Sequence, residues 1–272
     1  MHQKQKFMAN NKITTDKSTP GYWRVILNNP PINAIDDSMY DEVYDLVEEI
    51  ENEPTLKVVT FESANPDFFI AHYSTAEPRS RFGKPKWVEA STRLAKSNVL
   101  SISLIRGRVR GGGMEFTMAS DIRFASKEKA IFGQPEVGTG LIPGGGALQR
   151  LPLLVGRSRA IEIILGADDY TAEKAELYGW INRAIPDTEF DNFVSNYIKR
   201  ILSFDKQSLS QCKETINHFG LADKGQLQAT EDIFFTTFGW PGALARFPKL
   251  REKGIGTYGD FELNLGKNIA NL

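Results

Sequence analysis

The sequence predicts an α/β core followed by a helical C-terminal region. Strand-like and helix-like patterns alternate over the first two-thirds of the 272 residues, and from about Glu189 onward the pattern is helical only. Glycine-rich segments at 111–113 and 144–146 also stand where a helix is expected to begin. We therefore expect one large α/β unit with helices after it.

The first part of the chain shows the alternation. Residues 22–29, YWRVILNN, have the composition of a strand, and Asp36, Asp37 or Ser38 can cap the helix that follows. That helix repeats its apolar residues at helical spacing, at Met39, Val43, Leu46, Val47 and Ile50. The next expected elements are a β-branched strand at 57–64, a helix carrying Trp87 and Leu94, and a strand at 101–107.

The middle of the chain combines glycine-rich turns with short elements. A helix is expected from about Gly112 to Ser120, and two short strands, 121–126 and 130–138, flank a polar KEK turn. The later expected elements are a glycine-rich turn into a helix, two helices joined near Gly166, a short strand in WINRAIP, and helices interrupted at Gly220, Pro241 and Gly254. This order predicts that the helical region follows the α/β core in the chain.

Composition excludes several classes of protein. A net charge of −1 argues against a general binder of nucleic acid or of membrane surfaces, which would need an excess of basic residues. The single cysteine, Cys212, excludes an internal disulfide framework and a cysteine-based zinc site. The three histidines, His2, His72 and His218, share no metal-ligand spacing, so we expect no metal site.

The sequence also bears on location. No stretch approaches the roughly 18 apolar residues of a membrane span. The N-terminal segment is polar and lacks the apolar region of a secretory signal. We expect a cytoplasmic protein that does not bind membranes.

The three glycines at 111–113 allow two interpretations. They can form a tight packing turn, or they can expose backbone N–H groups at a helix N-terminus, where the helix dipole attracts an anion or a developing oxyanion. The known nucleotide-binding glycine motifs do not fit the local sequence, which disfavours a phosphate cradle and a dinucleotide oxidoreductase. A small oxyanion site remains as the functional alternative to the turn.

Two glutamates are candidate catalytic residues because each lies beside a glycine-rich segment of the sequence. Glu115 comes one helical turn after the glycines, and Glu136 stands in FGQPEVG, at an expected strand end before a glycine-rich turn. A single glutamate is usually a solvated surface residue, but both of these lie among apolar residues and glycines. Two carboxylates that meet in one apolar site can divide acid and base roles if their surroundings separate their pKa values.

Two longer segments, taken together, resemble a known family. The first is RGGGMEFTMASDIRFAS and the second is AIFGQPEVGTGLIPGGGALQRL. With NNPPINAID and FFIAHYS upstream and GRSRAIEIILGADDYTAEKAELYGWINRAIP downstream, they resemble the crotonase (enoyl-CoA hydratase/isomerase) superfamily over roughly residues 20–205. The resemblance implies a ClpP/crotonase-like spiral of repeated ββα units over 21–205 and a helical region that mediates trimerisation at 206–272. The polar residues 1–20 before the core are expected to form a flexible lead-in.

The resemblance also implies roles for individual residues. In that family two backbone N–H groups form an oxyanion hole for the thioester carbonyl of an acyl-CoA, and they match Gly112 and Ala71 here. The two glutamates that activate water and protonate C2 in the hydratases match Glu115 and Glu136. Further substrate-binding positions implied by the match are His72, Tyr73, Gly111, Pro135 and Gly144.

The chain departs from the family pattern at two places near the site. Hydratases of the family usually have Gly-Ala-Asp after the oxyanion alanine, where this chain has His72, Tyr73 and Ser74. His72 is either a substrate contact or a structural loop histidine. The arginines at 106, 108 and 110 replace small or apolar residues, and they could meet coenzyme A phosphates, a carboxylated acyl group, or acids at a subunit contact.

The function expected from the resemblance is enoyl-CoA hydration, the addition of water across the C2=C3 bond of a 2-enoyl-CoA. Coenzyme A enters as part of the substrate, no separate cofactor or metal is expected, and the chain is expected to form a homotrimer or a dimer of trimers. Alternatives are isomerase or hydrolase chemistry of the same superfamily, and a non-catalytic acyl-CoA-binding protein. Product analysis separates the enzymes, and tight thioester binding without turnover would identify the binder.

Overall fold

The chain builds two β-sheets from ten short strands in the part described. The computed structural model describes residues 11–74, 80, 82 and 86–272. One sheet has six strands in the order β1-β2-β3-β5-β7-β10, and the other has four in the order β4-β6-β8-β9. The strands are β1 (Ile13–Thr19), β2 (Tyr22–Leu27), β3 (Val58–Ser63), β4 (Phe68–Ile70), β5 (Leu100–Ile105), β6 (Arg108–Arg110), β7 (Ile122–Ser126), β8 (Ile131–Gly133), β9 (Asp169–Thr171) and β10 (Arg183–Ile185).

A strand–strand–helix unit repeats along the chain. Each of the pairs β3/β4, β5/β6 and β7/β8 gives its first strand to the large sheet and its second to the small one, and a helix follows each pair. Equivalent strands of successive units pair in parallel within both sheets. The predicted spiral of ββα units and the helical C-terminal region are both confirmed.

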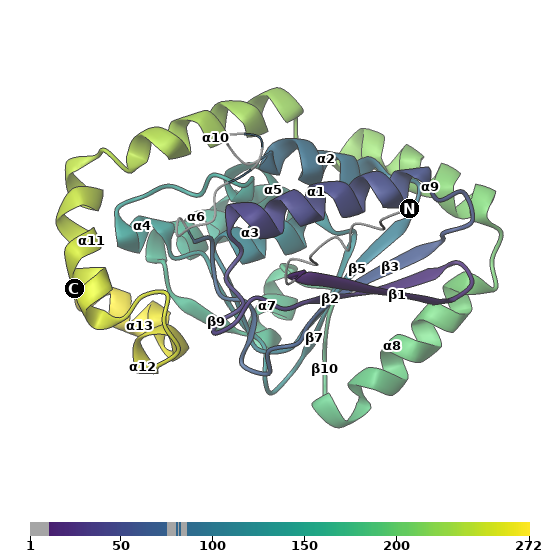
Figure 1. The fold of residues 1–272 in the computed structure, drawn as a ribbon, viewed down its shortest axis with the longest axis horizontal. Coiled ribbons are helices and arrows are strands. Elements are labelled where there is room, and N and C mark those ends of the chain that lie inside the picture. The colour runs from purple at the N-terminus through teal and green to yellow at the C-terminus, as the bar shows by residue number, and fades with distance from the viewer. Residues whose placement is uncertain (1–10, 75–79, 81, 83–85) are drawn as a thin grey trace, which may run out of the picture.

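Helices cover both faces of the large sheet. Helix α1 (Asp37–Asn52) begins at Asp36, whose side chain accepts a hydrogen bond from the Met39 amide, and its predicted apolar face is buried against the sheet. Helix α8 (Asp187–Leu202) packs its apolar residues on the opposite face, against residues of β3, β5 and β7. The sheet therefore lies between these two helices, as Figure 1 shows.

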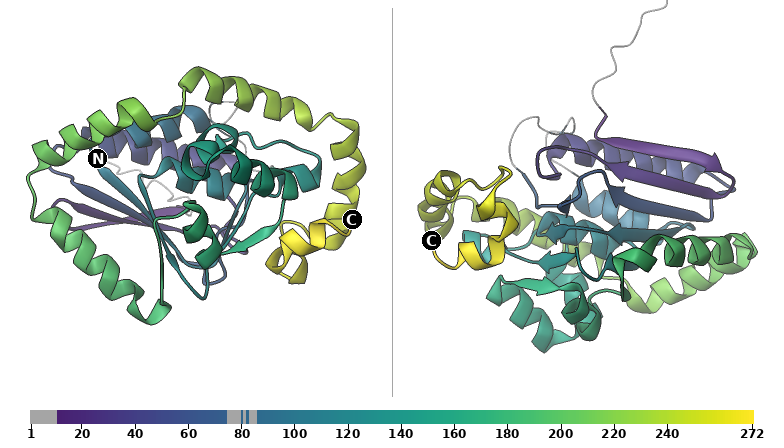
Figure 2. Two further views of the ribbon diagram at one scale, coloured as in Figure 1. Left: turned by 180° about the vertical axis from the view of Figure 1, so that it is seen from behind. Right: turned by 90° about the horizontal axis from the view of Figure 1, so that it is seen from below.

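The other helices position the site and close one end of the molecule. They are α2 (Trp87–Lys96), α3 (Gly112–Ala119), α4 (Glu136–Thr139), α5 (Ala147–Val155), α6 (Arg157–Gly166), α7 (Ala172–Tyr178), α9 (Lys206–Gly220), α10 (Lys224–Thr237), α11 (Pro241–Lys253), α12 (Asp260–Leu263) and α13 (Leu265–Ile269). Helix α10 packs on α2 and α5, α11 on α4, and α13 on β9. The last four helices thus wrap around the end of the core that carries α4 (Figures 1 and 2).

Three sequence predictions are corrected by the structure. The flexible lead-in over 1–20 is wrong for Ile13–Thr19, which form β1 antiparallel to β2; residues 1–10 lie outside the described residues. Only Ile131–Gly133 of the strand expected at 130–138 is extended, because α4 begins at Glu136. The helices expected to join near Gly166 are separated by β9.

None of the helices in the described ranges combines the length and apolar character that spanning a membrane requires.

Candidate active site

The glycines at 111–113 lie where the chain passes from β6 into α3. Gly111 has φ of +49°, in the region that favours glycine, and its amide donates a hydrogen bond to the Gly133 carbonyl. A Cβ on Gly112 would lie 2.9 Å from Cβ of Tyr73, and one on Gly113 would lie 2.5 Å from the Ile70 carbonyl oxygen. Close packing therefore requires these glycines, and the same geometry places the free N-terminal amides of α3 beside the chain segment that follows β4.

That segment, Ala71 to Ser74, is held in place by the loop before α1. The Ile35 amide donates to the His72 carbonyl at 3.0 Å, and the Ser74 amide donates to the Ile35 carbonyl at 2.9 Å. Ala71 itself is fully buried. The two segments that the sequence predicts to supply oxyanion donors, around Ala71 and Gly112, thus lie side by side.

Glu115 lies one turn into α3 and is 5% exposed. Its Oε1 accepts a hydrogen bond from the Ala147 amide at 3.0 Å. Burial raises the pKa of Glu115, while the backbone amides of Ala147, Gly145 and Gly146 and the charge of Arg150 act in the opposite direction. The turn before α5 therefore partly stabilises this carboxylate in its ionised form.

Glu136 is the first residue of α4 and is 9% exposed. The Gln134 side-chain amide donates to both of its carboxylate oxygens, at 3.1 Å each. Burial, followed by the negative charge of Glu115, raises the pKa of Glu136 to about 8. A Cβ on Gly111 would lie 2.8 Å from Oε1 of Glu136, so this carboxylate lies against the glycine turn.

Both glutamates line one cavity of about 500 Å³. Of the residues predicted from the sequence, His72, Tyr73, Gly111, Gly112 and Pro135 also line it. Gly144 and Ala71 are not part of the lining: Gly144 packs against the side chain of Phe234, and Ala71 is fully buried directly before His72. Six aromatic residues line the same cavity, namely Tyr40, Tyr73, Trp87, Phe234, Phe238 and Phe247.

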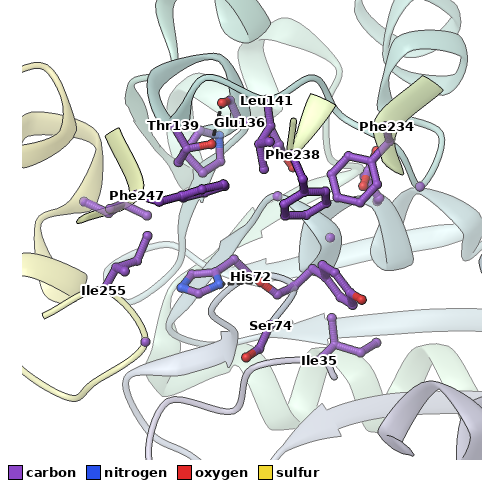
Figure 3. A pocket seen from close by; sticks show the side chains of 18 of the residues that line it. Ile35, His72, Ser74, Glu136, Thr139, Leu141, Phe234, Phe238, Phe247 and Ile255 are labelled. Carbon is purple, nitrogen blue, oxygen red and sulfur yellow. Dashed lines mark hydrogen bonds between the residues drawn. The ribbon is translucent and has the colours of Figure 1, made fainter. Parts of the chain in front are cut away.

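Figure 3 shows how the cavity is divided. Phe234 and Phe238 gather on one side of His72, and Phe247 and Ile255 lie on the other. The C-terminal region therefore contributes to both sides, with Phe234 from α10 and Phe247 from α11, and residues of the core complete the lining. Within the described ranges, no three His, Cys, Asp or Glu side chains are grouped closely enough to hold a metal ion.

Comparison with known proteins identifies the family. The model of the enoyl-CoA hydratase/isomerase family matches residues 20–239. The chain belongs to this enzyme family. A crystal structure from Streptomyces avermitilis, described as a candidate enoyl-CoA hydratase, is 35% identical and superposes with a TM-score of 0.91 over 98% of this chain and 99% of the other.

Curated relatives of the enoyl-CoA hydratase/isomerase family are more distant. The short-chain-enoyl-CoA hydratase of Clostridium acetobutylicum is 30% identical over 200 residues, which cover 71% of this chain and 76% of that protein. A Dictyostelium discoideum relative is 34% identical over 139 residues, which are 51% of this chain and half of that protein's length. These similarities establish the family and the fold.

The departures from the family pattern at residues 72–74 have defined contacts here. Tyr73 donates its hydroxyl to Asp37 Oδ1 at 2.7 Å and packs its ring against Trp87, with ring centroids 4.5 Å apart. His72 lines the cavity with its ring between the Tyr73 carbonyl and Glu262 of α12. His72 therefore combines the two roles considered from the sequence: it lines the cavity, and its ring also contacts Glu262 in the C-terminal region.

The three arginines form contacts within the chain and do not line the cavity. Arg106 follows β5 and pairs with Asp187 and Asp191 of α8. Arg108 and Arg110, on β6, instead reach the C-terminal region: Arg108 donates to the Leu263 carbonyl at 2.6 Å. The fully buried Arg110 makes two 2.7 Å hydrogen bonds to Asp169 and one to the Glu262 carbonyl.

Sequence reasoning missed the part of the cavity that comes from far along the chain. Phe234 and Phe247 lie in helices without a recognisable motif, Phe238 directly follows α10, and the apolar spacing of this region indicated only helix. Glu262, at the border of the cavity, lies in α12. The contact between His72 and Glu262 joins residues 190 positions apart. No local signal in the sequence identifies such a pair.

Proposed function

We propose that the chain adds water across the C2=C3 bond of a 2-enoyl-CoA. The observation that carries the proposal is that two buried glutamates with different hydrogen-bond donors line one cavity beside the N-terminus of α3. The family match and the similarity to a short-chain-enoyl-CoA hydratase support it. The product is a 3-hydroxyacyl-CoA.

In this proposal the Ala71 and Gly112 amides bind the thioester carbonyl oxygen. Gly112 is the first residue of α3, where an amide has no intrahelical acceptor and the helix dipole favours negative charge. As the nucleophile adds, negative charge develops on that oxygen, and each donor of such a hole is worth about 3–4 kcal/mol of transition-state stabilisation.

The two glutamates divide the proton transfers. Glu115, supported by the amides of the turn before α5, accepts a proton from water as the water oxygen bonds to C3. Glu136, with its raised pKa, gives a proton to C2. The proton taken up by Glu115 then passes through solvent back to Glu136, which restores the starting state. One water is consumed in total, and no electrons are transferred, so the step needs no redox cofactor; coenzyme A is the carrier of the acyl group.

The aromatic residues that line the cavity indicate which acyl groups the site prefers. Tyr73, Trp87 and Phe234 form edge-to-face or tilted ring contacts with one another beside the glutamates. Such a wall favours a bulky apolar acyl group over a polar one, because burial of apolar area contributes about 25 cal/mol per Å². We therefore propose that acyl groups longer than crotonyl, or ring-bearing, are preferred.

The direct test is an assay with crotonyl-CoA, a medium-chain linear 2-enoyl-CoA and cinnamoyl-CoA, with the products identified by mass and by chromatography. We expect 3-hydroxyacyl-CoA from at least the larger substrates. Glu115→Gln combined with Glu136→Gln should lower kcat by about 10²–10⁴-fold or more while the circular dichroism spectrum stays unchanged. Full activity of this double variant, or a shifted double bond or free acid as the product, would contradict hydration.

Two further expectations accompany the proposal. A homotrimer or dimer of trimers is implied by the family resemblance, a cytoplasmic location is expected from the sequence pattern, and both stay predictions.

A further inference from the structure

A buried ion pair connects the segment after β4 to the C-terminal region. Nε2 of His72 lies 2.8 Å from Oε1 of Glu262, whose side chain is completely shielded from solvent. His72 directly follows Ala71 and lines the cavity. We infer that Glu262 holds His72 as an imidazolium, which acts as a fixed positive charge beside the proposed oxyanion site; this inference rests on the proposed function for its catalytic consequence.

The hydrogen bonds of the ring support the charged form. Nδ1 of His72 lies 2.9 Å from the Tyr73 carbonyl oxygen, which can only accept, so Nδ1 carries a hydrogen. Nε2 faces a carboxylate, which accepts when ionised. The Gly256 amide donates to the same Glu262 oxygen, a further contact that favours the ionised carboxylate. A ring that donates from both nitrogens is an imidazolium.

The charges around His72 agree with this assignment. The charged groups that face the ring are Glu262 from α12, Arg110 from β6 and Glu136 from α4. Burial by itself lowers the pKa of His72, and Arg110 adds to this, but the charge and hydrogen bond of Glu262 and the bond to the Tyr73 carbonyl raise it overall. Arg110 is itself neutralised by a two-pronged pair with Asp169, which reduces its repulsion of His72.

Glu262 acts as a positioning residue because its own place is rigidly set. Arg110 donates to the Glu262 carbonyl at 2.8 Å, and Arg108 donates to the neighbouring Leu263 carbonyl at 2.6 Å. Both arginines project from β6, the strand that runs into the glycine turn. The same strand therefore supports both the start of α3 and the carboxylate that holds the His72 charge.

The charge has two consequences for the proposed reaction. It favours negative charge on the thioester oxygen near Ala71, since a preorganised positive group in a water-poor site stabilises a developing oxyanion. It also lowers the pKa of Glu136, which burial and Glu115 raise. Because both ring nitrogens are already engaged, His72 contributes through its field and its fixed position, without a proton transfer.

The first test measures the protonation of His72 directly and needs no activity. The chain has only three histidines, so the ring signals of His72 can be assigned by ¹⁵N NMR from their loss in His72→Gln. We expect both ring nitrogens of His72 to be protonated at neutral pH, and the ring to titrate above the ordinary value for histidine. In Glu262→Gln, which keeps the shape of the side chain, the ring should become neutral at neutral pH. A neutral His72 ring in the wild-type protein at neutral pH would overturn the inference.

The second test separates the charge from simple anchoring of the C-terminal region. Glu262→Gln and His72→Gln should each lower kcat by about tenfold with little change in KM, and the double variant should be no worse than His72→Gln. Arg108→Gln is the matched control, because it removes an anchor of the same segment without touching His72. Equal losses in Arg108→Gln and Glu262→Gln, with His72 titrating as in the wild type, would show that Glu262 only anchors the chain. If no substrate is hydrated, the proposed function fails while the NMR result still decides the protonation of His72.

Discussion

Glu115 and Glu136 are both buried glutamates that line one cavity, but the hydrogen-bond donors and the charges around their carboxylates differ. Glu115 accepts a hydrogen bond from the backbone amide of Ala147, the first residue of α5, and the charge of Arg150 on the same helix favours its ionised form. Glu136 receives the neutral Gln134 amide and faces the negative charge of Glu115. Burial raises both pKa values; at Glu136 the negative charge of Glu115 adds to the rise, whereas at Glu115 the backbone amides and Arg150 oppose it.

The support behind Glu115 is built into the turn. Arg150 donates to the Gly145 carbonyl at 2.8 Å and to Ser91 Oγ at 3.0 Å, which fixes the turn against α2. A Cβ on Gly145 would lie 2.7 Å from Oε2 of Glu115. The turn therefore approaches the carboxylate as closely as a glycine permits. The Glu136 carboxylate also packs against a glycine turn, since a Cβ on Gly111 would lie 2.8 Å from its Oε1, but its side-chain donor is the Gln134 amide.

The largest expected effect on kcat/KM comes from disturbing the contacts of the Glu115 carboxylate. In Gly145→Ala, the new methyl group must displace the Glu115 carboxylate from the Ala147 amide. We expect kcat/KM for the preferred enoyl-CoA to fall by about 100-fold, the usual cost of misplacing a reacting group by about 1 Å. Steady-state kinetics measures it.

Gly166→Ala is the control for that substitution. Gly166 ends α6 and has no atom within 4 Å of the position that a Cβ would occupy. Its replacement should leave kcat/KM unchanged. If Gly145→Ala behaves like Gly166→Ala, the close approach of the turn to Glu115 has no part in catalysis.

A smaller change in kcat/KM is expected when the pH is varied. The proposed reaction requires one proton on the pair, held by Glu136, with Glu115 ionised. As the pH rises through the raised pKa of Glu136, that proton is lost and kcat/KM should fall; as the pH falls, Glu115 takes up a proton and kcat/KM should fall again. A profile measured from about pH 5 to about pH 10 should be bell-shaped, with a loss of about tenfold per pH unit on each limb. A profile that rises continuously to the alkaline end would contradict the assignment of the proton to Glu136.

The sequence predicted the parts of the fold and site that depend on local patterns. The glycine turn at 111–113, Glu115 and Glu136 lie within two short segments, so the residues themselves indicate a helix start and two acids near it. Strand β1 was missed although Pro20-Gly21, between the Thr-rich residues 13–19 and the strand YWRVIL, is a hairpin signal.

The rest of the site depends on distant contacts. Phe238 and Glu262 reach the cavity or its border only because α10 to α13 fold back over the core, and apolar spacing along a helix does not say which surface that helix will cover. The difference in surroundings between the two glutamates also depends on tertiary contacts. Neither the turn at Gly145 near Glu115 nor the Gln134 contact can be oriented without the tertiary structure.

The smallest expected effect is on stability, and it tests the Glu136 side of the comparison without any substrate. A carboxyl group whose pKa is raised by folding binds its proton more tightly in the folded state than in the unfolded state. The free energy of unfolding therefore falls as the pH rises from the unfolded value, near 4.3, to the folded value. Glu136→Gln removes this penalty, so the variant should be more stable than the wild type at alkaline pH and about equally stable at acidic pH.

Thermal unfolding at about pH 4 and about pH 8.5 measures this difference. We expect the Tm of Glu136→Gln to exceed that of the wild type by at least about 2–4 °C at the higher pH, the shift that about 1 kcal/mol produces in a chain of roughly this size. Glu252→Gln, at an exposed position of α11, is the control and should change Tm at neither pH. A Tm difference for Glu136→Gln that is the same at both pH values would mean that folding leaves the proton affinity of Glu136 unchanged, and the contrast between the two glutamates would then have to come from Glu115 alone.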